Sequence, residues 1–99
     1  MLFDSYGGAI NWVASHAIAF VHRNTLFCIQ YLTYDGGAGW LGQTHAAMGR
    51  YVSGQAYQNY IDRDLRHWQQ AYYGSNYPRL VRTRRRVDPH HFFKFPQAI

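Results

Sequence analysis

The chain has 99 residues, a length that suits one small domain or part of a larger one. Hydrophobic residues make up 47% of it and aromatic residues 18%, which excludes a disordered chain and predicts rings that cover a pocket or a partner. The single cysteine, Cys28, excludes an intramolecular disulfide. Its apolar neighbours favour a small packed side chain over a nucleophile.

The net charge of +5 is unevenly distributed along the chain. Half of the ten basic residues lie within eight positions: Arg79, Arg82, Arg84, Arg85 and Arg86. Such a run indicates either an anionic partner or a solvated helix face. No zinc-ligand spacing, RNP-like stretch or heptad repeat accompanies it, so nucleic acid is not the expected partner. The sequence shows no membrane span and no export signal, so a cytoplasmic location is the default expectation.

The first half of the chain is expected to contain one buried strand and one helix. A turn at Gly7-Gly8 precedes a short apolar stretch. Residues 25–34 then alternate with mostly apolar side chains on both faces, which predicts a strand buried on both sides. Asp35 and the glycines that follow it break this strand, and residues 40–50 carry apolar side chains at helical spacing.

The second half is expected to contain two helices and a closing turn. Either aspartate within residues 62–64 can cap a helix that runs to about residue 73 and ends at Gly74. Residues 75–76 offer Ser and Asn caps for the next helix, and Asp88-Pro89 stops it. Three phenylalanines then close the chain as an aromatic cluster: Phe92, Phe93 and Phe95.

Four stretches of the sequence, in this order, resemble the berberine bridge enzyme-like FAD-linked oxidases. They are YGGAI at 6–10 with AFVHR at 19–23 and FCIQY at 27–31, AYQNYID at 56–62, YYGSNYPRL at 72–80, and VDPHHFFKFPQAI at 87–99. The resemblance implies an α+β fold, here a fragment with one or two strands of an antiparallel substrate-domain sheet, about three helices and a C-terminal return segment. Residues 1–50 would end that sheet and form the following helix, and residues 51–99 would be the family's C-terminal segment.

The resemblance also implies a cofactor and a partner. In that family an N-terminal domain holds FAD, often through covalent links to a His and a Cys of that domain. We therefore expect FAD as the cofactor, an FAD-binding domain outside this chain as the partner, and a small-molecule substrate. The expected activity is hydride transfer from an alcohol or amine-type substrate to the flavin, and the isolated 99 residues are expected to be incomplete for it.

Gln30 is the first candidate catalytic residue. It is a polar side chain in a nearly apolar strand, and a buried amide needs hydrogen-bond partners. In the family this position carries a Gln or Glu that faces the substrate near the flavin. As Gln it can orient a hydroxyl or carbonyl group but cannot act as a general base. The alternative is a core amide with a structural role.

Tyr57, Asn59 and Tyr60 form the second candidate set. In the family this Tyr-x-Asn-Tyr segment runs alongside the flavin, so all three are expected to contact the cofactor. A tyrosinate there can remove the proton while hydride leaves, and either Tyr57 or Tyr60 can take that catalytic role. Asn59 can both donate to and accept from the polar edge of the flavin. The alternative is that both tyrosines are packing residues.

The histidines do not predict a metal site. No pair has helical i, i+4 spacing, and no cysteine pair joins them. Three hypotheses for the function therefore remain open. The first is a segment of an FAD-dependent oxidoreductase, the second a non-catalytic remnant of one, and the third a small basic interaction protein that uses the arginines of residues 79–86.

Overall fold

The computed structural model describes residues 1–34 and 36–99, and for Ala38 it describes the backbone alone. The described residues form two compact units. The first unit contains Met1–Val13 and Arg23–Gly54, and the second contains Ala14–His22 and Gln55–Ile99. No helix within the described ranges is long and apolar enough to cross a membrane.

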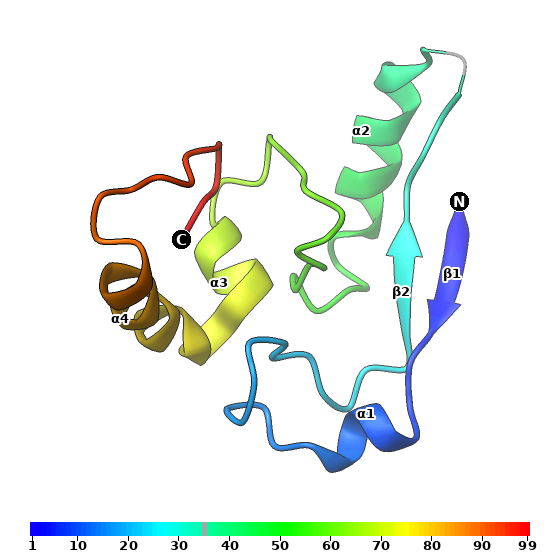
Figure 1. The fold of residues 1–99 in the computed structure, drawn as a ribbon. Helices are drawn as coiled ribbons and strands as arrows, with labels where there is room; N and C mark the ends of the chain where they lie inside the picture. The colour runs from blue at the N-terminus through cyan, green and yellow to red at the C-terminus, as the bar shows by residue number, and fades with distance from the viewer. Residues whose placement is uncertain (35) are drawn as a thin grey trace. The chain divides into compact units, whose positions relative to one another are not determined.

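An antiparallel pair of strands forms the centre of the first unit (Figure 1). Strand β1 spans Leu2–Ser5 and pairs with strand β2, which spans Phe27–Gln30. Because successive side chains point to opposite faces of a strand, Phe3 and Phe27 share one face, where their ring centroids are 5.4 Å apart. The other face carries Asp4, Cys28 and Gln30.

The strand predicted over residues 25–34 is shorter and more exposed than expected. Only residues 27–30 form β2, and none of them is fully buried. The prediction of a strand buried on both sides is therefore wrong for the described residues. The physical reason is that β2 pairs with β1 alone, so two short strands leave both faces of the ribbon partly open.

Two helices complete the first unit. Helix α1 (Ala9–Trp12) is a single turn that follows Gly8, whose φ of 55° suits glycine. Helix α2 (Ala38–Met48) confirms the helix predicted over residues 40–50, with a start two residues earlier. The ring of Tyr31 packs edge-to-face against His45 of this helix, with centroids 5.5 Å apart. Asp35, part of the predicted break before α2, lies outside the described residues.

The second unit contains helix α3 (Trp68–Tyr73), the 3-10 turn η1 (Gly74–Asn76) and helix α4 (Tyr77–Val87). Tyr72 is almost fully buried at its centre, with 1% of its surface exposed. Aromatic rings from α3 and α4 contact one another around it: those of Trp68, Tyr73 and Tyr77. The predicted ends of these helices at Gly74 and before Pro89 are confirmed.

The predicted capping residues of both helices have other roles. Asp62 accepts a hydrogen bond from the backbone N–H of Asp64 at 2.9 Å, which makes a local turn, and α3 begins only at residue 68. Asn76 makes no side-chain cap. Its buried amide Nδ2 donates to the carbonyl oxygens of Ser15 and Ile18, at 2.6 and 3.0 Å. These bonds hold residues 14–22 within the second unit.

The two-stranded antiparallel sheet and the helices confirm the α+β class. The assignment of this sheet to a substrate domain stays a prediction. So does the division of the chain into family segments at residues 1–50 and 51–99.

Candidate functional site

Gln30 is the last residue of β2 and is half-buried. Its side-chain Nε2 donates a hydrogen bond to Oδ2 of Asp4 in β1. The antiparallel register sets Asp4 opposite Cys28, two residues before Gln30, so the two polar side chains are diagonal neighbours on the same face. The expected need of this amide for a partner is therefore met by a carboxylate.

Cys28 lies opposite Asp4 and two residues before Gln30, on the same face of the ribbon. Burial raises the pKa of its thiol, and the negative charge of Asp4 raises it further, while a hydrogen bond from Tyr6 lowers it. A raised pKa keeps the sulfur in the thiol form, which is a poor nucleophile. The raised pKa and the partial burial thus favour the packed role expected for Cys28 over a nucleophile.

The structure brings Tyr57, Asn59 and Tyr60 together in the second unit. Nδ2 of Asn59 donates a hydrogen bond to the hydroxyl oxygen of Tyr57 at 2.9 Å. The ring of Tyr60 stands edge-to-face against that of Tyr57, with centroids 5.1 Å apart. Tyr57 is half-buried, whereas Asn59 and Tyr60 are exposed. The Tyr57 oxygen, rather than that of Tyr60, is the acceptor of the Asn59 amide.

Residues that precede this segment in the sequence support the Tyr57 ring. The ring of Phe20 meets Tyr57 edge-to-face at 6.0 Å and meets the buried His22 in the same way at 5.1 Å. Nδ1 of His22 is 3.0 Å from Oε1 of Gln55, to which it donates when that nitrogen carries the proton. The Tyr57 ring is therefore held by side chains from two stretches of sequence.

The predicted site residues fall into two sets. Tyr57, Asn59 and Tyr60 contact one another in the second unit, and Gln30 pairs with Asp4 in the first. Sequence reasoning missed Asp4 and Gln55. Asp4 had a detectable signal, because it is the polar residue at an alternating position in the short stretch Leu2–Ser5. Gln55 is outside the expected helices, and no sequence pattern marks it as a site residue.

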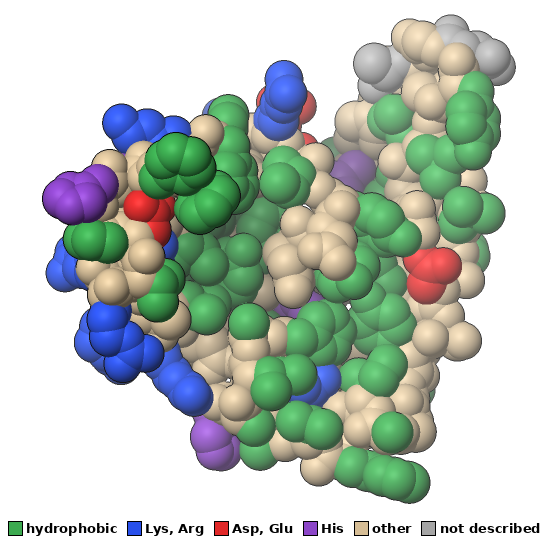
Figure 2. Space-filling model, viewed as in Figure 1, with side chains coloured by type: hydrophobic (Ala, Val, Ile, Leu, Met, Phe, Trp, Pro, Cys, Tyr) green, Lys and Arg blue, Asp and Glu red, His purple; other side chains and the backbone are tan. Residues whose placement is uncertain are grey.

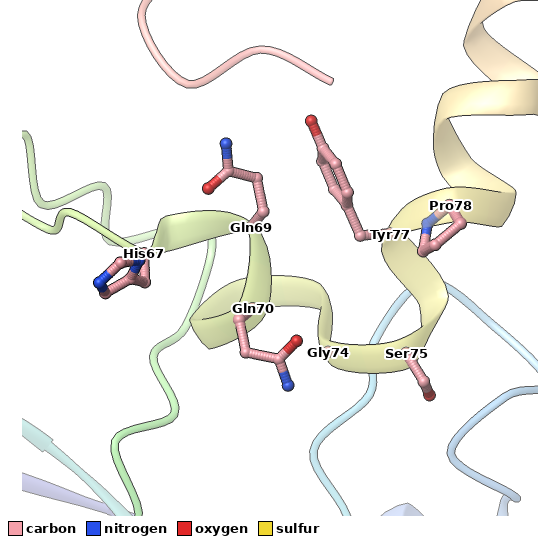
Figure 3. A pocket seen from close by; sticks show the side chains of 7 residues that line it. All are labelled: His67, Gln69, Gln70, Gly74, Ser75, Tyr77 and Pro78. Carbon is pink, nitrogen blue, oxygen red and sulfur yellow. The ribbon is translucent and has the colours of Figure 1, made fainter.

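A hollow of about 330 Å³ lies beside α3, η1 and the start of α4 (Figure 3). It is lined by His67, Gln69, Gln70, Gly74, Ser75, Tyr77 and Pro78. The side chains of Gln69 and Tyr77 extend to one side, whereas those of Gln70 and Ser75 extend to the other (Figure 3). The polar groups diverge, and the predicted site residues are elsewhere, so the hollow has no assigned role.

The arginines of α4 divide into two groups. Arg79 donates to the carbonyl oxygen of His16 at 3.0 Å, and Arg84 donates to that of Ile99 at 3.0 Å. The other three are exposed on the helix surface: Arg82, Arg85 and Arg86. Figure 2 shows basic side chains gathered over α4. Within the described ranges, no group of three His, Cys, Asp or Glu side chains could hold a metal ion.

Comparison with known proteins shows which proteins the sequence of this chain resembles. Residues 56–99, which contain Tyr57, Asn59 and Tyr60, match the family model described as "Berberine and berberine like". The chain is 34% identical to monolignol oxidoreductase AtBBE-like 13 of Arabidopsis thaliana, over 99% of this chain and 22% of that protein. It is also 34% identical to the berberine bridge enzyme-like protein Cyn d 4 of Cynodon dactylon, over 100% of this chain and 24% of that protein.

Over its whole length the chain resembles the berberine bridge enzyme-like proteins. A bacterial relative, the uncharacterized FAD-linked oxidoreductase YgaK of Bacillus subtilis, is 32% identical over 97% of this chain and 23% of its own length. The chain thus spans about a quarter of the length of the relatives that it matches. No solved structure gave a significant match.

Proposed function

We propose that this chain forms part of an FAD-dependent oxidoreductase that removes a hydride from an alcohol or amine-type substrate. The family match over residues 56–99 and the name of the B. subtilis relative support this function. In the proposed enzyme, an FAD-binding domain that these 99 residues do not include holds the cofactor. This chain would supply side chains that meet the substrate and the reactive face of the flavin.

The Tyr57 segment fits a flavin chemically. It offers an exposed amide and two aromatic rings, which can meet the polar edge and the planar face of the ring system. A bound flavin would accept the hydride, and this is the chemistry that the cofactor supplies. Asn59, Tyr57 and Tyr60 are the residues of this chain that would contact it.

The observation that carries the proposal is the hydrogen bond from Asn59 to the Tyr57 oxygen. An N–H group forms a stronger hydrogen bond when the accepting oxygen is negatively charged. In its phenolate form, which the Asn59 amide would stabilise, Tyr57 can therefore take a proton from the substrate as hydride leaves, and becomes a neutral phenol. We assign this base to Tyr57, and we assign Tyr60 to packing against its ring. Gln30 would orient the substrate.

A hybrid enzyme tests this proposal. The chain replaces the matching 23% of the B. subtilis relative, and bleaching of the flavin absorbance is followed without oxygen against a panel of alcohols and amines. Tyr57→Phe is expected to slow flavin reduction by about 10²- to 10⁴-fold, the usual contribution of a general base. Tyr60→Phe keeps the ring contact and is expected to slow it by less than about tenfold.

Tyr51→Phe is the matched control, because Tyr51 is exposed and lies outside the Tyr57 segment. If the hybrid binds FAD but no alcohol or amine bleaches it, the oxidoreductase function is wrong. If Tyr57→Phe reduces flavin as fast as the Tyr51→Phe control, the assignment of the base to Tyr57 is wrong.

A second function, a basic interaction protein, is favoured by one observation. Arg82, Arg85 and Arg86 lie at i, i+3 and i+4 on α4, and no ion pair joins them to a carboxylate of the described residues. If they bind a polyanion, Arg82→Gln/Arg85→Gln weakens binding to single-stranded DNA and lowers its salt dependence. Arg63→Gln/Arg66→Gln, which removes the same charge from an exposed site elsewhere, is the control. Equal effects of the two pairs would contradict this function.

A further inference from the structure

The ribbon of β1 and β2 places a carboxylate against the residue that the proposed function assigns to the substrate. Asp4 lies in the middle of β1, and its Oδ2 accepts the hydrogen bond that Nε2 of Gln30 donates. The backbone pairing sets their strand positions, and both side chains are half-buried. The contact therefore involves two side chains whose backbones the sheet fixes.

We propose that Asp4 is a positioning residue that holds the carboxamide of Gln30 in one orientation, with the nitrogen towards Asp4 and the carbonyl Oε1 away from it. The proposal rests on the proposed function, in which Gln30 meets the substrate. It assigns Asp4 no contact with the substrate or the cofactor. Asp4 acts through Gln30 alone.

The charge of Asp4 selects the orientation of the amide. An ionised carboxylate only accepts hydrogen bonds, whereas a carboxamide has a donor end and an acceptor end. Turning Oε1 of Gln30 towards Asp4 would bring two oxygens together without a proton between them, so the amide nitrogen faces Asp4.

This orientation limits the ligands that Gln30 can recognise. A carbonyl oxygen has two lone pairs and accepts up to two hydrogen bonds, so Oε1 can accept one from a substrate hydroxyl or amine. A substrate that offers only an ether or carbonyl oxygen at this point would meet an acceptor and lose the bond. The geometry therefore favours a hydroxyl or N–H donor beside the carbon that loses hydride.

The side-chain amide of Gln30 can be observed directly in the 99-residue chain. In ¹⁵N-labelled protein its NH₂ signal is assigned by its loss in Gln30→Leu. In the native chain we expect one of the two NH₂ protons to be shifted downfield and to exchange slowly with water. In Asp4→Asn the partner can donate or accept, so this shift and the slow exchange should be lost. Asp4→Glu keeps the carboxylate and should restore them at least in part.

Asp64→Asn is the matched control, because it removes one exposed negative charge in the second unit. It should leave the Gln30 signal unchanged. The backbone spectrum of each variant shows whether the ribbon is still folded, and if Asp4→Asn unfolds it, Asp4→Ser replaces that variant. A Gln30 signal that is the same in the native chain and in the folded Asp4 variant would overturn the proposal.

The role in recognition is tested in the hybrid with the B. subtilis relative, using a primary alcohol and its methyl ether as ligands. Perturbation of the flavin spectrum measures the two Kd values. We expect the native sequence to prefer the alcohol by about tenfold, the effect of one hydrogen bond, and Asp4→Asn to lose most of this preference. An unchanged preference in Asp4→Asn would overturn the role of Asp4 in recognition.

The two proposals fail in different ways. A hybrid that binds FAD but is not bleached by any substrate contradicts the proposed function, while the NMR signal of Gln30 still decides whether Asp4 orients the amide. Conversely, an active hybrid with an unshifted Gln30 signal leaves the proposed function standing and overturns the role of Asp4.

Discussion

Asp88 joins the end of α4 to the closing segment of the chain. Its carboxylate accepts the backbone N–H groups of Phe92 at 2.7 Å and Phe93 at 3.1 Å. Arg84, one turn earlier, donates to the carbonyl oxygens of Asp88 and Ile99. A carboxylate that accepts two backbone N–H groups is more stable in its charged form, so this one residue fixes the turn at Pro89.

This arrangement predicts how stability depends on pH. The N–H of Phe92 is the largest cause that lowers the pKa of Asp88 below its ordinary 3.8, with smaller contributions from Phe93, Arg84 and His91, while burial opposes them. Since the folded pKa is below the unfolded one, the carboxylate stabilises the fold above pH 3.8. That stabilisation is lost as the pH falls through the lower folded value.

Urea unfolding of the native chain and of Asp88→Asn between pH 6 and pH 2 measures this effect. The native chain should be the more stable at pH 6, and the difference should shrink as the pH falls below 3.8 and through the lower folded pKa of Asp88. Asp64→Asn serves as a control, because Asp64 is an exposed aspartate with no such pair of backbone donors. A difference that stays constant to pH 2 would contradict the assigned role of Asp88.

For single residues, the sequence shows which ones are candidates for the site, but it does not show which side chains they contact. Gln30 stands out because it is an amide in an apolar strand. Asp4, 26 positions earlier, becomes its partner only because the strand register makes the two residues diagonal neighbours. The sequence leaves Tyr57 and Tyr60 equivalent. Only the side-chain geometry shows that Tyr57 receives the Asn59 amide.

Among the elements, the join between α3 and α4 depends most on a single residue. Gly74 ends α3 with a φ of 49°, a left-handed conformation that costs other residues about 1 kcal/mol or more. A Cβ at this position would also lie 3.3 Å from Cγ2 of Val21. Both the backbone conformation and the close approach of residues 14–22 therefore require glycine here.

We expect Gly74→Ala to destabilise the chain by about 1–3 kcal/mol. Gly42→Ala is the matched comparison, because Gly42 lies inside α2, where an added Cβ meets nothing within 4 Å. That substitution should stabilise α2 by about 0.5–1 kcal/mol, since alanine is the better helix former. Chemical denaturation followed by circular dichroism measures both. A neutral Gly74→Ala would show that the turn is not constrained as described.

Local signals predicted the helices, whereas packing decided the remaining boundaries. Apolar spacing located α2, and Pro89 and Gly74 located the ends of α4 and α3. The cap expected for α4 failed because Asn76 satisfies two carbonyl groups about 60 residues away instead. A side chain that can either cap its own helix or bind a distant loop gives no sequence signal of which it does.

Across the whole chain, burial is distributed unequally between the two units. Of the side chains that the structure describes, five are buried, and all of them lie in the second unit: His22, Ala71, Tyr72, Asn76 and Asp88. Among the side chains that the structure describes in the first unit, none is fully buried, and several large apolar ones are exposed: Leu2, Phe3, Trp12, Leu26 and Tyr34. A two-stranded ribbon without a closed core has little apolar burial to offset the entropy of folding.

The first unit should therefore open more readily than the second, which native-state hydrogen exchange can measure. Relative to the rates of an unstructured peptide, the backbone amides of β1 and β2 should exchange at least tenfold faster than those of Tyr72 and its neighbours in α3. The reason is that local opening costs less free energy where fewer apolar contacts are lost. Equal protection in the two units would contradict this.

If the proposed FAD-binding domain covers the exposed apolar side chains, its presence should slow exchange in the ribbon more than in α3, since binding stabilises most the part that was open.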